Sequence, residues 1–135
     1  MRPSDYPEVA LFPEDRFALA QPRGHVDGDL VERYGLAMAY HPDWQPGFTE
    51  VWDLTLSGTV DFVPSDIGRM KALEEETLEQ LRGTQTIIII DRPLIRITVD
   101  FYALLVRPMG RQIVAAGSHE EASEILGISE IPVLT

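Results

Sequence analysis

Four consecutive isoleucines at positions 87–90 constrain the fold of this chain more than any other feature. Successive side chains of a β-strand point to opposite faces of its sheet, so a run that is apolar at every position indicates a strand buried on both faces. Branching at Cβ in all four residues favours a strand over a helix. Such a strand needs helices on both faces of its sheet, which predicts an α/β fold.

The segments on either side of this run alternate between short apolar runs and helical periodicity. Turn-forming residues at 13–15 separate two apolar runs, which predicts a β-hairpin or two edge strands. The other predicted strands cover 51–54, 60–63, 84–90 and 112–116, and the predicted helices cover 30–38, 64–82, 94–106 and 118–126. This order predicts a central, mostly parallel sheet of four or five strands flanked by about four helices.

The length and charge of the chain restrict its organisation and its partners. A chain of 135 residues fits a single domain, here with a loose N-terminal arm over 1–8 and a tail over 128–135. It has 22 acidic and 11 basic side chains and thus a net charge of −11. A negative charge disfavours binding to nucleic acid or to an anionic membrane surface. The sequence has no cysteine, no apolar leader and no membrane-length apolar run, so we expect a cytoplasmic protein.

The sequence predicts no metal ion and no cofactor. Its three histidines, His25, His41 and His119, lack the spacing of a metal site, and there is no cysteine to complete one. The acidic run at 74–76 falls on the polar side of the predicted second helix, so we expect it to be solvated. No glycine-rich phosphate loop or nucleophile elbow is present.

Asp53 ends a predicted strand, and the carboxyl ends of strands are where open α/β sheets bind ligands. An aspartate there also commonly bonds to the backbone of the following turn, which is the interpretation we favour. The alternative is a small enzyme that uses Asp53 together with Asp91, at the end of the isoleucine strand. No nucleophile and base pair accompanies them, so the sequence favours a non-catalytic protein.

The order of elements resembles the anti-sigma-factor antagonist (STAS, SpoIIAA-like) group, and in particular its small bacterial members without an assigned role. The resemblance covers about residues 9–127 as a pattern of elements, carried by the aspartate-ended strand and the segments 58–66, 86–90, 113–116 and 118–122. It implies a STAS-type α/β domain that acts through a protein partner.

The resemblance also implies a candidate phosphorylation site. In partner-switching members, a serine at the start of the helix after this strand is phosphorylated by the cognate kinase. Aligned without gaps, the first serine of the family's pair falls on Ser65 and the phosphorylated second serine on Asp66. Two alternatives remain: Ser65 takes the role with a shift of one residue, or the switch is absent and Ser65 is only the helix N-cap.

The predicted helix over 94–106 is apolar almost all round, interrupted mainly by Arg96 and Asp100. Such a helix is either buried or covered by a partner. We expect part of it to face a second subunit or a small apolar ligand, with Phe101 and Tyr102 as anchors. The remaining candidates for this surface are Trp44, Phe48, Trp52 and Asp53. The sequence thus predicts a homodimeric binding or regulatory domain, with ordinary core packing as the alternative role of each aromatic.

Overall fold

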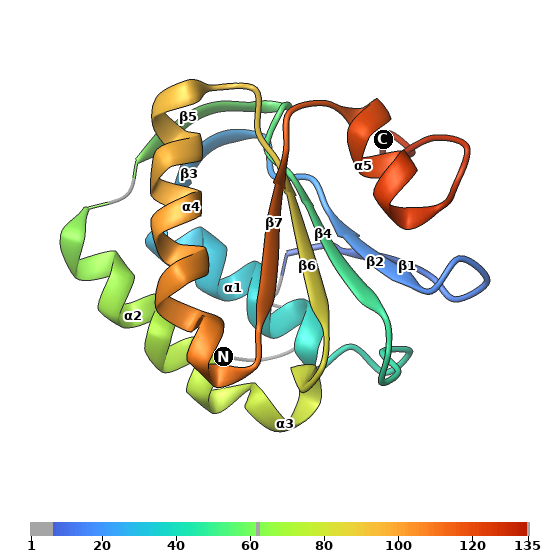
Figure 1. Cartoon of the computed structure of the whole chain (residues 1–135), viewed down its shortest axis with the longest axis horizontal. Helices are drawn as coiled ribbons and strands as arrows, with labels where there is room; N and C mark the ends of the chain where they lie inside the picture. The colour runs from blue at the N-terminus through green and yellow to red at the C-terminus, as the bar shows by residue number, and fades with distance from the viewer. Residues whose placement is uncertain (1–6, 62, 135) are drawn as a thin grey trace.

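The computed structural model of the chain describes residues 7–61 and 63–134 (Figure 1). The strands are β1 (Ala10–Phe12), β2 (Phe17–Ala20), β3 (Gly24–Asp27), β4 (Thr49–Asp53), β5 (Ser57–Asp61), β6 (Gln85–Ile89) and β7 (Gln112–Ala116). The helices are α1 (Gly28–Ala39), α2 (Pro64–Glu76), α3 (Leu78–Leu81), α4 (Pro93–Val106) and α5 (His119–Leu126), with a 3-10 turn at Arg107–Met109.

Five strands form the main sheet in the order β1-β2-β4-β6-β7. The first two form the predicted antiparallel hairpin, and every other neighbouring pair is parallel. The isoleucine strand β6 lies between β4 and β7, where Ile87 pairs with Val51 on one side and Val114 on the other. The predicted mostly parallel α/β fold is confirmed.

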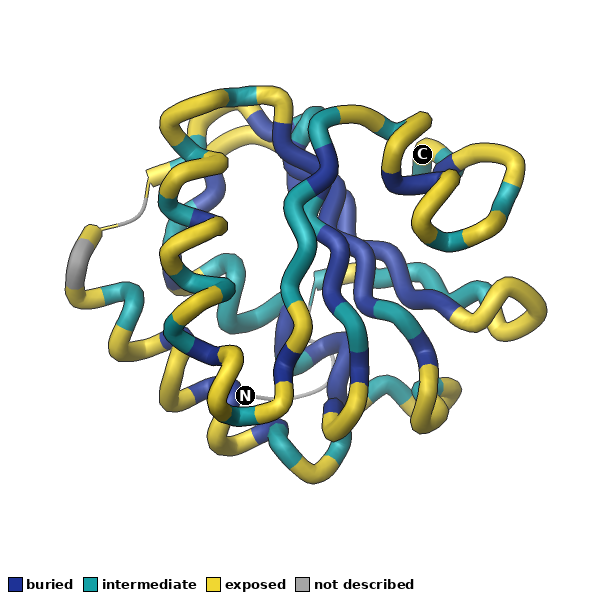
Figure 2. Tube along the Cα trace, in the orientation of Figure 1, coloured by how far each residue is buried: buried dark blue, intermediate teal, exposed yellow. Residues whose placement is uncertain are grey.

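Helices cover both faces of this sheet, as the isoleucine run requires. Helices α1, α2 and α4 lie on one face, and α5 with the C-terminal segment lies on the other (Figure 1). Ile87 and Ile89 pack in the core beside Ala122 of α5, whereas Ile88 packs on the opposite side with Met38 of α1. Figure 2 shows the strands as the most buried part of the chain, with the outer turns of the helices exposed.

The structure differs from the sequence-based expectation at two elements. The unpredicted strand β3 pairs with β5 in a second, two-stranded parallel sheet. The predicted single helix over 64–82 is two helices, α2 and α3, that meet at Thr77. The Thr77 hydroxyl donates to the carbonyl of Leu73 at 2.9 Å, a local bond that competes with regular helix geometry.

The two ends of the chain were predicted to be an arm and a tail. Most of the expected arm, residues 1–6, lies outside the described residues. The expected tail packs against the sheet, with Ile131 buried in the core. No helix in the described ranges is both long enough and apolar enough to cross a membrane.

Candidate functional site

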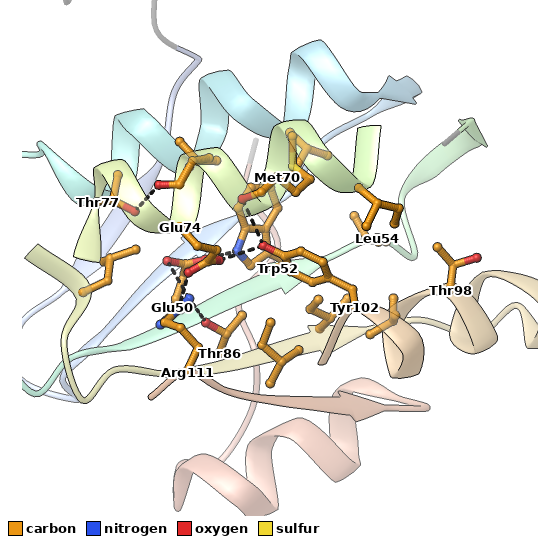
Figure 3. Close-up of a pocket in the computed structure, with 18 of the residues that line it drawn as sticks. Glu50, Trp52, Leu54, Met70, Glu74, Thr77, Thr86, Thr98, Tyr102 and Arg111 are labelled. Carbon is orange, nitrogen blue, oxygen red and sulfur yellow. Dashed lines mark hydrogen bonds and ion pairs between the residues drawn. The ribbon is translucent and has the colours of Figure 1, made fainter. Parts of the chain in front are cut away.

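A cavity of about 110 Å³ lies between the main sheet and helices α1, α2 and α4. Most of its wall is apolar because it occupies the place where the inner face of the sheet meets three amphipathic helices. Its lining includes Leu73 and Ile88, together with Trp52, Leu54, Met70 and Tyr102, which are labelled in Figure 3. The sheet thus contributes one wall, and α2 and α4 contribute most of the opposite one.

One end of this cavity is polar and charged. Glu50 of β4, Glu74 of α2 and Arg111 beside β7 meet there, only 4%, 8% and 2% exposed. Figure 3 shows these three side chains together, with Leu54 and Thr98 at the other end of the cavity. Charged side chains are almost never buried to this degree unless they are paired. We call Glu50, Glu74 and Arg111 the charged cluster.

Arg111 makes three hydrogen bonds, one of them to Glu74 of the charged cluster. Its Nε donates to Glu74 Oε2 at 2.7 Å, and its Nη1 donates to the carbonyl of Thr84 at 2.9 Å. Its Nη2 donates to the Thr86 hydroxyl at 2.5 Å. A guanidinium fixed by acceptors on both sides ties α2 to the start of strand β6.

Tyr102 connects α4 to the same cluster. Its hydroxyl donates to Glu74 Oε1 at 2.9 Å, so both oxygens of the Glu74 carboxylate accept a hydrogen bond. Burial, and then the nearby Glu74 carboxylate, raise the pKa of Tyr102 far above its usual value. Tyr102 therefore remains a hydroxyl donor at any physiological pH.

Glu50 is the incompletely bonded member of the charged cluster. Its Oε1 accepts a hydrogen bond from the indole Nε1 of Trp52. Its buried Oε2 receives no hydrogen bond from any residue in the described ranges, and Arg111 Nη2 lies 3.8 Å away, too far for one. Burial raises the pKa of Glu50, against the opposing effect of Arg111. Two carboxylates therefore share one cation.

A second feature lies on the outside of α4. Four large apolar side chains are 58–80% exposed along one side of this helix, at the spacing that places residues on one helical face. They are Leu94, Ile97, Phe101 and Leu104, which we call the α4 stripe. Next to it, a groove between α4 and the edge strand β7 is lined in part by Leu104, Ile113 and Val114.

The structure divides the predicted aromatic candidates among three places. Trp52 and Tyr102 line the cavity, and Phe101 belongs to the α4 stripe. Trp44 and Phe48 instead pack edge to face, with ring centroids 5.7 Å apart, in the segment that leads into β4. The Trp44 indole also donates to the carbonyl of Gln80 at 3.0 Å, which is a structural contact.

Asp53 is completely buried, outside the lining of the cavity. Its Oδ1 accepts from the backbone N–H of Thr55 at 3.0 Å, the turn contact favoured from the sequence. Its Oδ2 accepts from Gln21 at 3.0 Å and lies 2.8 Å from His119 Nε2. Asp91 is exposed, 3.8 Å from Arg92, and does not line the cavity either. The two aspartates of the enzyme alternative therefore do not meet in this cavity.

Ser65 is exposed in the first turn of α2, but it is not the N-cap that one sequence alternative made it. The N-cap is Val63, whose backbone N–H donates to the Asp66 carboxylate at 2.9 Å. Pro64 has a fixed φ suited to the first helical position, so it starts the helix before Ser65. The capping interaction thus comes from Asp66.

The charged cluster was missed from the sequence, and Glu74 was wrongly placed on the solvated side of its helix. A usable signal existed, because Met70, Glu74, Thr77 and Leu81 recur at steps of three and four. Glu74 therefore belongs to the buried side of this segment. Glu50 likewise lies two residues before Trp52, which places both on one face of β4.

The fold is that of the anti-sigma-factor antagonist SpoIIAA, as the sequence resemblance predicted. A solved structure of SpoIIAA in its unphosphorylated form matches this chain with a TM-score of 0.51. The match covers 89% of this chain and 96% of that chain at 19% sequence identity. No family model matches the sequence, and no match was found among curated proteins.

Proposed function

We propose that this chain is a non-catalytic regulatory domain that acts through protein contacts, and that the first of these is a homodimer formed by the α4 stripe. The observation that carries the proposal is the exposure of four large apolar side chains on one face of one helix. A contiguous exposed apolar patch on a soluble domain marks an interaction surface. SpoIIAA, which has the same fold, is an anti-sigma-factor antagonist and thus also acts on a protein.

The order of residues in the α4 stripe favours a second copy of the chain as the occupant. Leu94 and Leu104 lie five residues on either side of Val99, and Ile97 and Phe101 lie two residues on either side. A two-fold interface brings one surface against itself, so its residues must be self-complementary. Two antiparallel α4 helices, related by a two-fold axis that crosses the stripe at the level of the buried Val99, interleave these four residues with their symmetry copies.

A further feature supports this arrangement. The partly exposed Ile113 and Val114 of β7, beside the stripe, extend the apolar surface past the helix. The core of a protein interface is apolar and depleted in charged side chains.

Replacing Phe101 with glutamate is expected to weaken the dimer at least about 100-fold, because the change buries a carboxylate at the centre of an apolar contact. Sedimentation velocity between about 1 and 100 µM measures the effect, at concentrations chosen to bracket the dissociation constants of ordinary dimers. The matched control is Val133→Glu, which places the same charge at an exposed valine outside α4. A wild-type protein that stays monomeric at the highest concentration, or an F101E dimer as stable as the control, contradicts the proposed interface.

Ser65 is the proposed regulatory phosphorylation site. Its exposure makes it accessible to a kinase, and the amino end of a helix stabilises a phosphate electrostatically. Peptide mapping by mass spectrometry, on protein isolated from the cells that make it, is expected to find phosphate on the peptide containing Ser65. The Ser65→Ala variant is expected to lack it. Phosphate confined to another residue, such as the exposed Ser118, contradicts this assignment.

A further inference from the structure

Among the described residues that line the cavity, Glu50 has a buried acceptor without a hydrogen-bond partner. Glu50 lines the charged end of the cavity, and its buried Oε2 receives no hydrogen bond from any residue in the described ranges. A buried carboxylate oxygen without a donor is costly, and a bound group that donates to it removes that cost. The unpaired oxygen therefore indicates a ligand that carries a hydrogen-bond donor.

The charges around Glu50 restrict which donor fits. The ionisable groups that face it are Glu74 from α2, Arg111 beside β7 and Tyr102 from α4, with the Trp52 indole of its own strand as a neutral donor. Arg111 is already bonded to Glu74, Thr84 and Thr86. With both glutamates ionised the cluster has one negative charge in excess, which attracts a cation and repels an anionic head group such as a fatty-acid carboxylate.

The size and lining of the cavity restrict the rest of the ligand. A cavity of about 150 Å³ holds benzene in a well-packed protein core, so about 110 Å³ holds roughly four or five non-hydrogen atoms. The wall beyond the charged cluster is apolar, with Leu54, Met70 and Ile88 among its residues. The body of the ligand must therefore be a small hydrocarbon group.

We propose that this cavity binds a small amphiphilic primary amine, with its ammonium group on Glu50 Oε2 and its hydrocarbon chain along the apolar wall. The ammonium supplies the missing cation of the charged cluster and a donor for the unbonded oxygen. This site is separate from the α4 stripe, so either proposal can fail without the other.

Isothermal titration calorimetry with butylamine tests the site, with 1-butanol and butanoate as neutral and anionic probes of the same length. We expect butylamine to bind one site per chain with a dissociation constant between about 10 µM and 1 mM, the range for a ligand of this size. Butanol is expected to bind at least about ten-fold more weakly and butanoate not to bind, because neither replaces the missing cation. Affinity for butylamine should decrease as the pH is lowered through the acid range, because a proton competes with the ammonium group for Glu50.

Glu50→Gln is the variant that tests the charged contact. It keeps the size of the side chain and removes its negative charge, so we expect at least a ten-fold loss in affinity for butylamine with little change for butanol. Glu75→Gln is the control, because Glu75 is the exposed neighbour of Glu74. If E50Q does not fold, nuclear Overhauser effects between butylamine and the Trp52 indole in the wild-type protein locate the ligand instead. Equal binding of butanol and butylamine overturns the proposal, as does the absence of saturable butylamine binding or of these effects.

Discussion

Replacing Arg111 with methionine is expected to lower the free energy of unfolding by about 3–5 kcal/mol, because it leaves two buried carboxylates without their cation. Glu50 and Glu74 are both nearly inaccessible to solvent, so water cannot take the place of the guanidinium. Methionine fills much of the same volume, which limits any contribution from a new cavity. The loss therefore measures the electrostatic role of Arg111 in joining α2 to the sheet.

Urea denaturation at neutral pH measures this effect, with Arg107→Met as the matched control. Arg107 is exposed in the 3-10 turn after α4, so its replacement should change the free energy of unfolding by less than about 0.5 kcal/mol. An R111M protein within about 1 kcal/mol of this control would show that the charged cluster does not depend on its cation.

The loss in free energy of unfolding of the R111M variant should also depend on pH, and the burial of Glu50 determines the direction of this dependence. Burial already raises the pKa of Glu50, and removal of Arg111 takes away the main opposing effect. A carboxyl group with a raised pKa in the folded state stabilises the fold below its unfolded pKa, and this stabilisation is lost as pH rises through the folded value. The deficit is therefore expected to be larger at pH 8 than at pH 5.

Local patterns in the sequence were sufficient to predict the fold. The isoleucine run of β6 identifies a strand covered on both faces, and the periodicity around it identifies the helices, since both signals come from neighbouring residues. Strand β3 was missed because Gly24 and His25 are exposed and give its four residues no alternating pattern. Its pairing with β5 is a tertiary contact that outweighs weak local propensity.

The charged cluster was not predictable in the same way, because its members are distant in the sequence. Glu50 and Glu74 lie 24 positions apart, and Arg111 lies 37 positions beyond Glu74. The local patterns indicate at most that Glu50 and Glu74 face inward, whereas their meeting with Arg111 depends on the packing of α2 on the sheet and on the order β4-β6-β7. The α4 stripe, by contrast, belongs to one helix, so the apolar composition of that helix was visible in the sequence.

Asp53→Ala is expected to lower the free energy of unfolding by about 2–4 kcal/mol, because hydrogen bonds to a buried charged group contribute strongly and their partners are left unpaired. The side chain of Gln21 lies beside this carboxylate and also bonds to the carbonyl of Pro132 at 2.7 Å and to the N–H of Leu134 at 2.7 Å. His119, which lies 2.8 Å from the same carboxylate, begins α5. One aspartate thus fastens α5 and the C-terminal segment to the sheet.

The comparison with Asp91→Ala separates this structural role from a catalytic one. Asp91 is exposed and lies 3.8 Å from Arg92, so its removal should change stability by less than about 0.5 kcal/mol. Urea denaturation of both variants provides the measurement. A D53A protein as stable as D91A would mean that the buried hydrogen bonds contribute little, and Asp53 would again need a functional explanation. A large loss confined to D53A means that its burial and bonding explain its place at the end of β4, with no substrate required.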